Sequence, residues 1–520
     1  MTIDADVLQG VVEELPPYNK YLLEDHPKKA IDNIPEFILQ VYREAVSILM
    51  PGCIRVRGYR PLPPQERIYR EIVDRRNTNV SIAISELDMY EFEFEDMQTH
   101  ARHYTYIYIP YTINRLLKIN GKRYSIPHTI METVFGRTAR DEIALRVIRA
   151  PLRFSRPTRQ PLVSAVDPTR VTSEWVLSAF IHMGRAKPIR TTMTILNYIC
   201  SKFGFLETLR RFGLEDDDII FTDTIADDTE TYEYYVAKSQ KGHDKNPLYL
   251  KVRHEILAQT QYKKIVANML YTTTLFSYHT VDDMYDPSGF IYRIMMGKII
   301  GGFESKDANA LNDANSHIAS LDTYLDGITK RRLWRFNIKV DDIYEFLQYI
   351  FTELDRIIVN SVPQNLYNKR IDTMENVLID IFVTDIFNSV YKMEKNNKPP
   401  TVEDVIKALS GKVQRFEKLD SHLPTQPDHY NDCQLAACGL TKVRQSGMGR
   451  SNSAGPGAKS PDSRFHPSIA VVETMTAFSG KNPTTNGLIN PFVEITPEGS
   501  IVRPHYADEI DTLMDYLPYR

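Results

Sequence analysis

The first residues with the right chemistry for a metal site form a run of carboxylates. Glu215-Asp-Asp-Asp218 is followed by Asp223, Asp227 and Asp228. Carboxylate oxygens bind divalent cations, but the spacing of these residues matches no known ligand loop. Runs of like charge are more often solvated surfaces. We therefore expect a solvated acidic face here and no metal site.

A second group that can bind metal lies nearer the C-terminus. His429, Cys433 and Cys438 supply one imidazole and two thiols, which are ligand types of zinc sites. They give only three ligands, and the spacing of the cysteine pair is unusual for zinc. Cys53 and Cys200 lie far away in the sequence. We expect free thiols, as in a protein of a reducing compartment.

The segment Ser453–Ser460 resembles a phosphate-binding loop in its glycine content. Ala458 separates Gly457 from Lys459, however, so the required Gly-Lys-[Ser/Thr] is absent. No strand pattern precedes the segment either. The sequence also shows no pairing of a nucleophile with a general base. Residue chemistry therefore predicts no catalytic residue and no metal ligand in this chain.

The composition is that of a globular protein with more than one domain. The chain has 520 residues, of which 42% are hydrophobic and 25% charged, and its formal net charge is -4. This length predicts roughly two to four domains. Because the net charge is negative, any contact with DNA or RNA must come from local basic clusters.

The sequence has neither the pattern of a signal peptide nor that of a membrane span. Asp4 and Asp6 stand where a signal peptide carries basic residues. Ile379–Phe387, one of the most apolar windows, is interrupted by Asp380 and Asp385. We expect a soluble protein of the cell interior without a membrane partner.

The first expected elements are an arm over residues 1–33 and a helix that starts at Pro35. Apolar residues from Phe37 to Leu49 keep helical spacing, and Pro51-Gly52 ends the helix. A β-rich stretch follows the helix.

Three segments of this stretch have strand patterns. Val80, Ile82 and Ile84 occupy alternate positions, Phe92 and Phe94 alternate with glutamates, and residues 104–109 are β-prone on both faces. Lys118–Tyr124 predicts a hairpin, because its central Asn-Gly pair is the strongest two-residue turn signal.

The remaining pattern combines helices with loops. Prolines are frequent in residues 150–170, which indicates a domain crossing. Apolar stripes at helical spacing run from Ile343 to Ile358 and from Met374 to Phe382. Residues 445–463 are rich in Gly, Ser and Pro and predict a flexible basic loop.

Several short segments near the C-terminus occur in a familiar order. Gln414-Arg-Phe416 and Gly439-Leu-Thr-Lys-Val-Arg444 come first, and Arg464-Phe-His-Pro-Ser468 and Asn486-Gly-Leu-Ile-Asn490 follow. Together they resemble the fork region of the β subunit of multisubunit DNA-directed RNA polymerases. That region contains Ser-Gln-Phe, Gly-Leu-Thr-Arg-x-Arg, Arg-x-x-His-Pro and Gly-Leu-Ile-Asn.

Two earlier segments resemble the same family. Leu366-Tyr-Asn-Lys-Arg-Ile371 is similar to the Leu-Gly-Asn-Arg-Arg-[Ile/Val] with which the chain re-enters the protrusion domain. Ile119-Asn-Gly-Lys-Arg-Tyr124 is similar to a segment of the first protrusion pass. The resemblance implies an α+β, multidomain fold with protrusion, lobe and fork. The implied domains are residues 1–150 (arm and first pass of the protrusion), 151–360 (lobe), 361–412 (second pass), 413–495 (fork) and 496–520 (tail).

The chain departs from the family in two places. Before Gly-Leu-Ile-Asn, where the family has Thr-Pro-Glu-Gly, this chain has Gly480-Lys-Asn-Pro483. The sequence ends at Arg520, shortly after the fork, whereas a full β subunit continues. This arrangement resembles the split subunits of phiKZ-like giant bacteriophages, and we expect the N-terminal half of such a β subunit.

The resemblance implies a subunit that positions nucleic acid and leaves catalysis to another chain. The family polymerises RNA with two metal ions on an Asp-Phe-Asp-Gly-Asp motif of the β′ subunit, and this sequence lacks that motif. We therefore expect Mg²⁺ on a β′-like partner and no cofactor on this chain. The expected role is to form the wall of the DNA cleft and the fork beside the RNA–DNA hybrid.

By position, Lys442 and Arg444 match the basic pair of the family's fork loop, where basic side chains follow phosphates without reading sequence. Lys369 and Arg370 suit either a structural role between protrusion and fork or a nucleic-acid contact. The full set of expected nucleic-acid-binding residues is Lys442, Arg444, Arg450, Lys459, Arg464, Arg415, Lys481, Asn482, Lys369 and Arg370.

The implied partners are a C-terminal β-like half, β′-like subunits, DNA, RNA and a promoter-specificity subunit. The implied location is the host cytoplasm during infection, with packaging in the virion left open. The alternative is a non-catalytic DNA-binding or structural phage protein on a degenerate polymerase scaffold. A stand-alone nucleotidyltransferase fits least, because the sequence has no cluster of metal-binding carboxylates.

Overall fold

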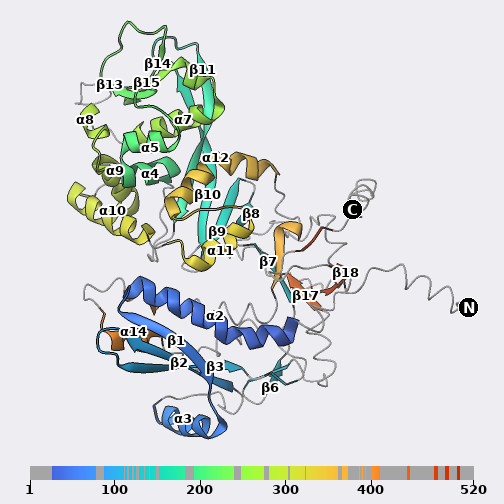
Figure 1. Cartoon of the computed structure of the whole chain (residues 1–520). Helices are drawn as coiled ribbons and strands as arrows, with labels where there is room; N and C mark the ends of the chain where they lie inside the picture. The colour runs from blue at the N-terminus through green and yellow to red at the C-terminus, as the bar shows by residue number, and fades with distance from the viewer. Residues whose placement is uncertain are drawn as a thin grey trace, which may run out of the picture. The chain divides into compact units, whose positions relative to one another are not determined.

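The structure is a computed structural model of the chain, which folds into two compact units, Met1–Thr133 with Gln364–Arg520 (unit 1) and Val134–Pro363 (unit 2) (Figure 1). The structure describes residues 26–77, 87–110, 112–113, 116–119, 122–124, 128–133, 135–139, 141–147, 151–181, 193–238, 247–274, 280–302, 305–322, 324–360, 366–372, 386, 389–390, 393, 400–409, 442–445, 473–477, 486–490, 493 and 501–503.

Unit 1 begins with a long helix that packs on a three-stranded antiparallel sheet. The helix is α2 (His26–Leu49), and the sheet has the order β1 (Ile54–Pro61), β2 (Leu87–Asp96), β3 (Arg102–Pro110). The helix ends at the predicted position but begins earlier than predicted, so the expected arm over 1–33 is wrong for its last residues. Pro35 lies inside the helix.

The predicted alternation in β2 is confirmed. Phe92 and Phe94 are fully buried, and the ring of Tyr42 in α2 meets both edge-on, with centroids 5.1 and 5.4 Å away. The Tyr42 hydroxyl donates a hydrogen bond to the carbonyl of Leu409 at 2.8 Å. Leu409 is the last residue of α14 (Val402–Leu409), so this one tyrosine ties together elements from both halves of unit 1.

The predicted hairpin in unit 1 is also confirmed. β5 (Leu116–Ile119) and β6 (Lys122–Tyr124) are antiparallel, and Ile119 pairs with Lys122, which leaves two positions for the connection. Together with β4 (Thr112–Ile113) they form a small sheet. The helix α3 (Pro64–Asn77) connects β1 to β2.

A five-stranded antiparallel sheet forms one side of unit 2. Its order is β12 (Met193–Thr194), β11 (Val171–Ile181), β10 (Pro151–Val163), β9 (Glu142–Arg146), β8 (Phe135–Ala139). β8, the first of these strands in the sequence, already belongs to unit 2. Unit 2 therefore begins before residue 151, where the lobe is predicted to start.

The proline-rich stretch does not form the expected domain crossing. Pro151 is the first residue of β10, and Pro157 lies at a register shift between Ser155 and Thr158. Strands tolerate proline at their first residue and at such irregularities, because there no ladder hydrogen bond from its nitrogen is needed. Pro151 and Pro157 therefore mark the start and an irregular position of one long strand, whereas Pro161 pairs regularly with Ser173.

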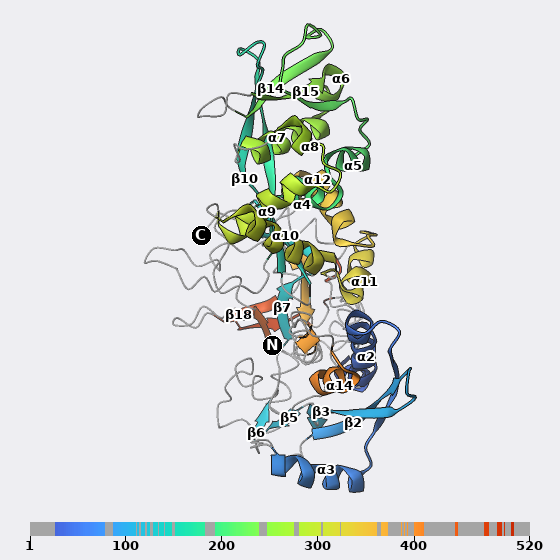
Figure 2. The same cartoon turned by 90° about the vertical axis from the view of Figure 1, so that its left-hand side faces the viewer.

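A second sheet of unit 2 has the order β13 (Ile219–Thr222), β15 (Leu248–Arg253), β14 (Tyr232–Lys238). The helices of unit 2 are α4 (Ile195–Phe203), α5 (Phe205–Arg211), α6 (His254–Leu257), α7 (Thr260–Thr274), α8 (Val281–Met284), α9 (Phe290–Gly301), α10 (Asp307–Asp322), α11 (Gly327–Arg335) and α12 (Ile343–Asn360). In both views α9 lies beside α4 and α10 (Figures 1 and 2).

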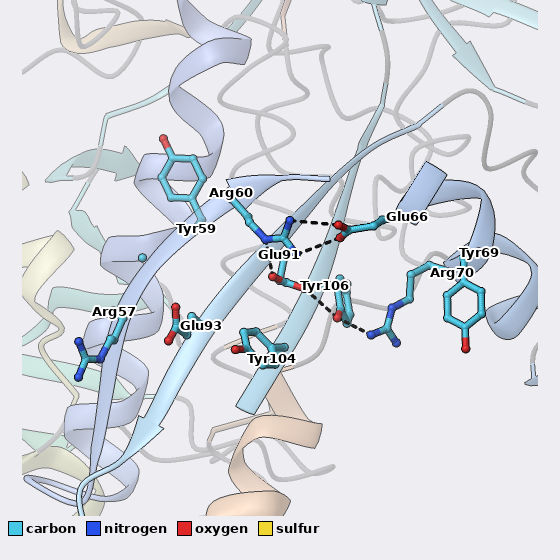
Figure 3. A pocket seen from close by; sticks show the side chains of 11 residues that line it. Arg57, Tyr59, Arg60, Glu66, Tyr69, Arg70, Glu91, Glu93, Tyr104 and Tyr106 are labelled. Atoms are coloured by element: carbon cyan, nitrogen blue, oxygen red, sulfur yellow. Dashed lines mark hydrogen bonds and ion pairs between the residues drawn. The ribbon is translucent and has the colours of Figure 1, made fainter. Parts of the chain in front are cut away.

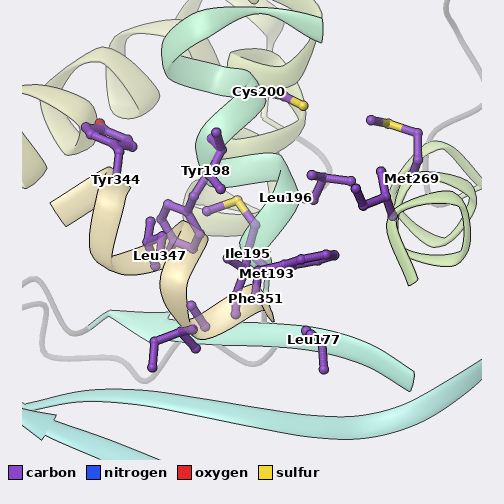
Figure 4. Packing of buried hydrophobic residues seen from close by; sticks show 14 of the residues in the cluster. Leu177, Met193, Ile195, Leu196, Tyr198, Cys200, Met269, Tyr344, Leu347 and Phe351 are labelled. Carbon is purple, nitrogen blue, oxygen red and sulfur yellow. The ribbon is translucent and has the colours of Figure 1, made fainter. Parts of the chain in front are cut away.

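The core of unit 2 surrounds α4 (Figure 4). The apolar stripe predicted for 343–358 is confirmed as the buried face of α12, and Leu347 and Phe351 pack there near Leu196. Thr194 caps α4 by accepting a hydrogen bond from the Asn197 amide at 3.2 Å. These apolar contacts and this cap fix the helices on the sheet.

A buried asparagine fastens α7 to β11. The Asn268 side chain accepts a hydrogen bond from the Leu177 amide at 2.7 Å and donates one to the Trp175 carbonyl at 3.0 Å. Both backbone groups belong to β11, so Asn268 continues the sheet's hydrogen bonding into the helix. A buried amide satisfied in this way holds a unique packing arrangement.

The mixture of helices and sheets agrees with the predicted α+β class. Within the described part of the chain, no helix is long and apolar enough to cross a membrane. The strand pattern at Val80–Ile84, the helix at Met374–Phe382 and the loop at 445–463 lie largely or wholly outside the described residues.

Candidate nucleic-acid interface

A five-stranded sheet in unit 1 gathers segments from four separate parts of the sequence. Its order is β16 (Lys369–Asp372), β7 (His128–Glu132), β17 (Lys442–Gln445), β19 (Asn486–Ile489), β18 (Glu473–Ala477) (Figure 1). Four of these five strands lie C-terminal to unit 2, whereas β7 precedes it. The sheet therefore joins the two passes of the chain through unit 1.

The central strand β17 pairs on both sides. Its Val443 lies beside His128 in a parallel pair with β7 and opposite Gly487 in an antiparallel pair with β19. Arg444 likewise lies between Thr129 and Asn486. The fork resemblance implies that Lys442 and Arg444 lie near the segment around His466 and Gly487. The backbone of β17 does lie beside Gly487, and His466 lies outside the described residues.

The register divides this sheet into two faces. Ile130 and Ile371 are paired with each other and buried, and they form a small core with Leu366, Val493 and Ile501. Because neighbouring positions along a strand belong to opposite faces, positions 442 and 444 belong to the face opposite this core. Position 370 belongs to the same face as 442 and 444.

Lys369 and Arg370, the two residues predicted for either a structural or a binding role, differ in burial. Lys369 lies opposite Glu132 on the core side and is only 3% exposed, whereas Arg370 is partly exposed. A buried ammonium does not reach a nucleic acid in solvent. The burial therefore favours the structural role for Lys369.

The other predicted contact residues cannot be placed in this sheet. Six of them lie outside the described residues, namely Arg415, Arg450, Lys459, Arg464, Lys481 and Asn482. The same holds for the thiol and imidazole group at His429, Cys433 and Cys438 and for the loop Ser453–Ser460. What the structure brings together is the set 369–370, 442–444 and 486–487.

Unit 1 also contains a polar cavity of about 590 Å³ on the outer face of the sheet β1-β2-β3, beside α3 (Figure 3). It is lined by four tyrosines, three arginines and three glutamates. Arg60 donates hydrogen bonds to Glu91 at 2.7 Å and to Glu66 at 2.9 Å. Arg70 lies over the ring of Tyr106 and donates to its hydroxyl at 2.6 Å.

The charges of this cavity largely neutralise each other. Glu91 is 8% exposed and accepts hydrogen bonds from both Arg60 and the Tyr106 hydroxyl. Burial raises the pKa of Tyr106 to about 12, and the hydrogen bond to Glu91 acts in the same direction. The phenol is thus neutral at physiological pH. The arrangement suits a rigid structural network better than a binding site for anions.

This cavity was not predicted from the sequence. The alternation in β2 predicts that Phe92 and Phe94 face the core. It does not predict which residues form ion pairs or hydrogen bonds with the glutamates between them. The signal was present in the arginines of β1, which the strand register places opposite β2: Arg60 pairs with Glu91. Only the pairing of the strands converts the two charge patterns into one network.

The acidic run in unit 2 is engaged with basic side chains. Asp216 pairs with Arg210 at 2.6 Å and Asp218 with Arg253 at 3.0 Å. Asp218 is 5% exposed and also accepts from the Glu215 amide at 2.8 Å, so the expectation of a wholly solvated face is wrong at this position. No group of three or more potential ligands that could hold a metal occurs among the described residues.

The comparisons with known proteins give one finding. A family model described as non-virion RNA polymerase subunit matches residues 3–504 of the chain. A comparison with curated proteins found no match. The family match covers both units and all five strands of the sheet that contains Lys442 and Arg444.

Proposed function

We propose that this chain, which belongs to the family of non-virion RNA polymerase subunits, is the N-terminal half of that polymerase's β-like subunit. As a polymerase subunit it acts in transcription, within a nucleotidyltransferase complex and together with other subunits. Its proposed task is to form a wall of the DNA cleft and the fork beside the RNA–DNA hybrid.

The observation that carries this proposal is the sheet that contains β17. The segments that resemble the β subunit at 366–371, 439–444 and 486–490 are far apart in the sequence, yet each contributes a strand to this one sheet. A sheet assembled from these segments is what a fork packed on a protrusion requires. It holds positions 442 and 444 on the face opposite its small apolar core.

The chemistry proposed for Lys442 and Arg444 is electrostatic. Basic side chains on a fixed strand bind successive phosphates without recognising bases, which suits an enzyme that moves along its template. The catalytic Mg²⁺ is proposed to lie on a β′-like subunit, since this chain has no Asp-Phe-Asp-Gly-Asp motif. A C-terminal β-like half and a promoter-specificity subunit complete the proposed assembly in the host cytoplasm.

The test is transcription by the reassembled polymerase with the double variant Lys442→Ala/Arg444→Ala. We expect activity to fall about ten-fold or more, and the dependence of template binding on salt to weaken by about one to two phosphate contacts. Assembly, followed by size-exclusion chromatography, should stay unchanged. The matched control is Lys306→Ala/Arg55→Ala, which removes two exposed basic residues elsewhere.

Full activity of the double variant with an unaltered salt dependence would contradict the proposal. The alternative function, a DNA-binding or structural protein on a degenerate scaffold, makes a different prediction. The chain would then purify from infected cells without companions that transcribe. Identification of the co-purifying chains by mass spectrometry separates the two functions, because the proposed one requires β′-like chains in the complex.

A further inference from the structure

Two large aromatic side chains, separated by one residue in the sequence, are exposed at the C-terminal end of α11. Trp334 is 50% exposed and Phe336 is 43% exposed. Rings of this size are usually buried, because burial of each ring removes a large apolar area from contact with water. The exposure of two such rings two positions apart indicates a surface that binds a partner or ligand.

The backbone holds both rings at the surface. Leu333 is fully buried and Ile338 is 4% exposed, so the residues that flank the rings are anchored in the core of unit 2. The amides of Phe336 and Ile338 both donate to the Leu333 carbonyl, at 2.9 and 3.0 Å. Asn337 has a left-handed conformation, with φ at 59°, and turns the chain out of the helix.

The same segment carries a concentrated positive charge. Residues 327–340 contain Lys330, Arg331, Arg332, Arg335 and Lys339 and no acidic residue. Lys339 is exposed and Lys330 partly exposed. Within the described part of the chain, neither lysine has a carboxylate oxygen within 4.0 Å. Of the acidic residues that flank the segment, Asp326 is buried and caps the other end of the helix, whereas Asp341 and Asp342 follow the segment directly.

A stabilising role in the helix explains only part of this pattern. Basic residues in the last turn of a helix interact favourably with its dipole, which accounts for Arg332 and Arg335. It accounts neither for Lys339, which lies beyond the helix, nor for two exposed rings. A binding surface explains all three features together.

We propose that Lys330, Trp334, Phe336 and Lys339, here called the α11 surface, bind single-stranded nucleic acid. Unpaired bases stack on the two rings, and the lysines bind phosphates. Proteins bind single-stranded nucleic acid with basic residues interleaved with aromatic ones, because every base has a face that can stack on an aromatic ring. In a duplex these faces are covered, so the α11 surface prefers unpaired strands.

This surface lies in unit 2 and is independent of the sheet in unit 1. It goes beyond the proposed function, since the resemblance to the β subunit assigns no residue of α11. Its failure and that of the proposed function are therefore distinguishable. Loss of the Lys442 and Arg444 contact leaves the α11 surface intact, and the reverse holds as well.

The chain offers a direct spectroscopic test, because it contains only two tryptophans, Trp175 and Trp334. In the full-length variant Trp175→Phe, fluorescence reports on Trp334 alone. We expect an oligothymidylate and an oligouridylate to quench it, since a base stacks on the ring, and a duplex of the same length to quench it far less. Comparison of the two oligonucleotides shows whether DNA or RNA is preferred.

Two polyanions without bases separate stacking from charge. Polyphosphate and polyglutamate should leave the emission of Trp334 almost unchanged. If polyglutamate quenches as strongly as the oligonucleotides, the α11 surface fits an acidic protein and the proposal is wrong. The same conclusion follows if no oligonucleotide quenches.

A second measurement keeps the native tryptophans, so that it does not depend on the folding of the Trp175→Phe variant. Binding of a labelled oligothymidylate is followed by anisotropy for the full chain and for Trp334→Leu/Phe336→Leu. We expect the affinity to fall about ten-fold. Lys330→Gln/Lys339→Gln should reduce the salt dependence by about one to two phosphate contacts. Unchanged affinity in folded variants, as judged by circular dichroism, would overturn the proposal.

Discussion

Arg444 of β17 lies beside Thr129 of β7 in a parallel pair, although all of unit 2 separates the two residues in the chain. A parallel pair of strands needs a long crossover connection, and here that connection includes a whole folded unit. Unit 2 can therefore be regarded as an insertion between two strands of one sheet. The position of Arg444 depends on the correct folding of both passes of unit 1.

Proline at position 443 should separate the strands without removing either basic residue. Val443 is the central residue of the two pairings of β17, and proline cannot donate the backbone hydrogen bond of an internal strand. We expect Val443→Pro to lower the stability of unit 1 by about 2 kcal/mol, because a facing carbonyl loses its donor. Thermal unfolding of the full chain measures this.

The same variant tests the link between the sheet and transcription. If Lys442 and Arg444 act through their fixed places, Val443→Pro should reduce transcription as much as their replacement by alanine. Val443→Thr is the matched control, since threonine is also β-branched and keeps its amide. If Val443→Pro folds, assembles and transcribes normally, Lys442 and Arg444 do not depend on the strand for their role in transcription.

Replacement of Lys369 separates the two roles that the sequence leaves open. Because its side chain is 3% exposed, we expect Lys369→Met to lower the stability of unit 1 by about 1–3 kcal/mol, through loss of the polar interactions of a buried group. Lys306→Met, at an exposed lysine, should change stability by less than about 0.5 kcal/mol. The melting temperature of the unit 1 transition measures the effect of Lys369→Met, and that of the unit 2 transition measures the effect of Lys306→Met.

A nucleic-acid role for Lys369 predicts the opposite pattern. Template binding would then weaken and lose salt dependence, while the melting temperature stayed the same. The two units can unfold separately, so their transitions must be assigned, for example by the fluorescence of the tryptophans, both of which lie in unit 2.

Elements with strong periodicity could be predicted from the sequence. The stripe from Ile343 to Ile358 became α12, and the alternation around Phe92 became β2, because apolar residues repeat there at the period of a helix or a strand. The first part of α2 lacked such a signal, since the residues before Pro35 are mostly polar. A proline inside the helix added to the error.

Features made by distant residues could not be predicted in the same way. The network of Arg60, Glu91 and Tyr106 needs the register of three strands, which no single segment specifies. The exposure of Trp334 is a similar case. Leu333, Trp334, Phe336 and Ile338 are all apolar, and only the packing of unit 2 decides which of them face the core. The position of Val443 beside Gly487 was expected only through the family resemblance.

Alanine at Gly297 should disrupt the packing of α9 against α10. A Cβ atom at this position would lie 1.8 Å from the carbonyl oxygen of Ala310, which is backbone and cannot rotate away. The two helices must therefore move apart. We expect Gly297→Ala to destabilise unit 2 by about 3 kcal/mol, in the range of severe overpacking.

Gly301 in the same helix is the matched control. A Cβ atom there would lie too close only to the carboxylate of Asp313, at 2.6 Å, and a side-chain end can rotate away; the Ser305 hydroxyl lies at an ordinary contact distance of 3.9 Å. Gly301→Ala should therefore change stability by less than about 1 kcal/mol, since alanine also favours the helix. Equal melting temperatures for the two variants would contradict the close approach of α9 and α10.

The ion pair at Asp228 should make part of the stability of unit 2 sensitive to acid. Hydrogen bonds from Lys251 and then from the Tyr234 hydroxyl lower the pKa of Asp228 below 3.8. A carboxyl group with a lowered pKa in the folded state contributes stability above the pKa of the unfolded state. This contribution is lost as the pH falls through the lower, folded value.

We therefore expect Asp228→Asn to be less stable than the natural chain at neutral pH, by about 1 kcal/mol at most, because the pair is partly exposed. The difference should disappear as the pH falls below 3.8, where the natural Asp228 is also becoming protonated. Melting temperatures of the unit 2 transition across this range measure it. Asp223→Asn, at an exposed carboxylate, should change the stability at neutral pH by less than about 0.5 kcal/mol. A constant difference at all pH values would mean that Asp228 stabilises unit 2 by its shape and not by its charge.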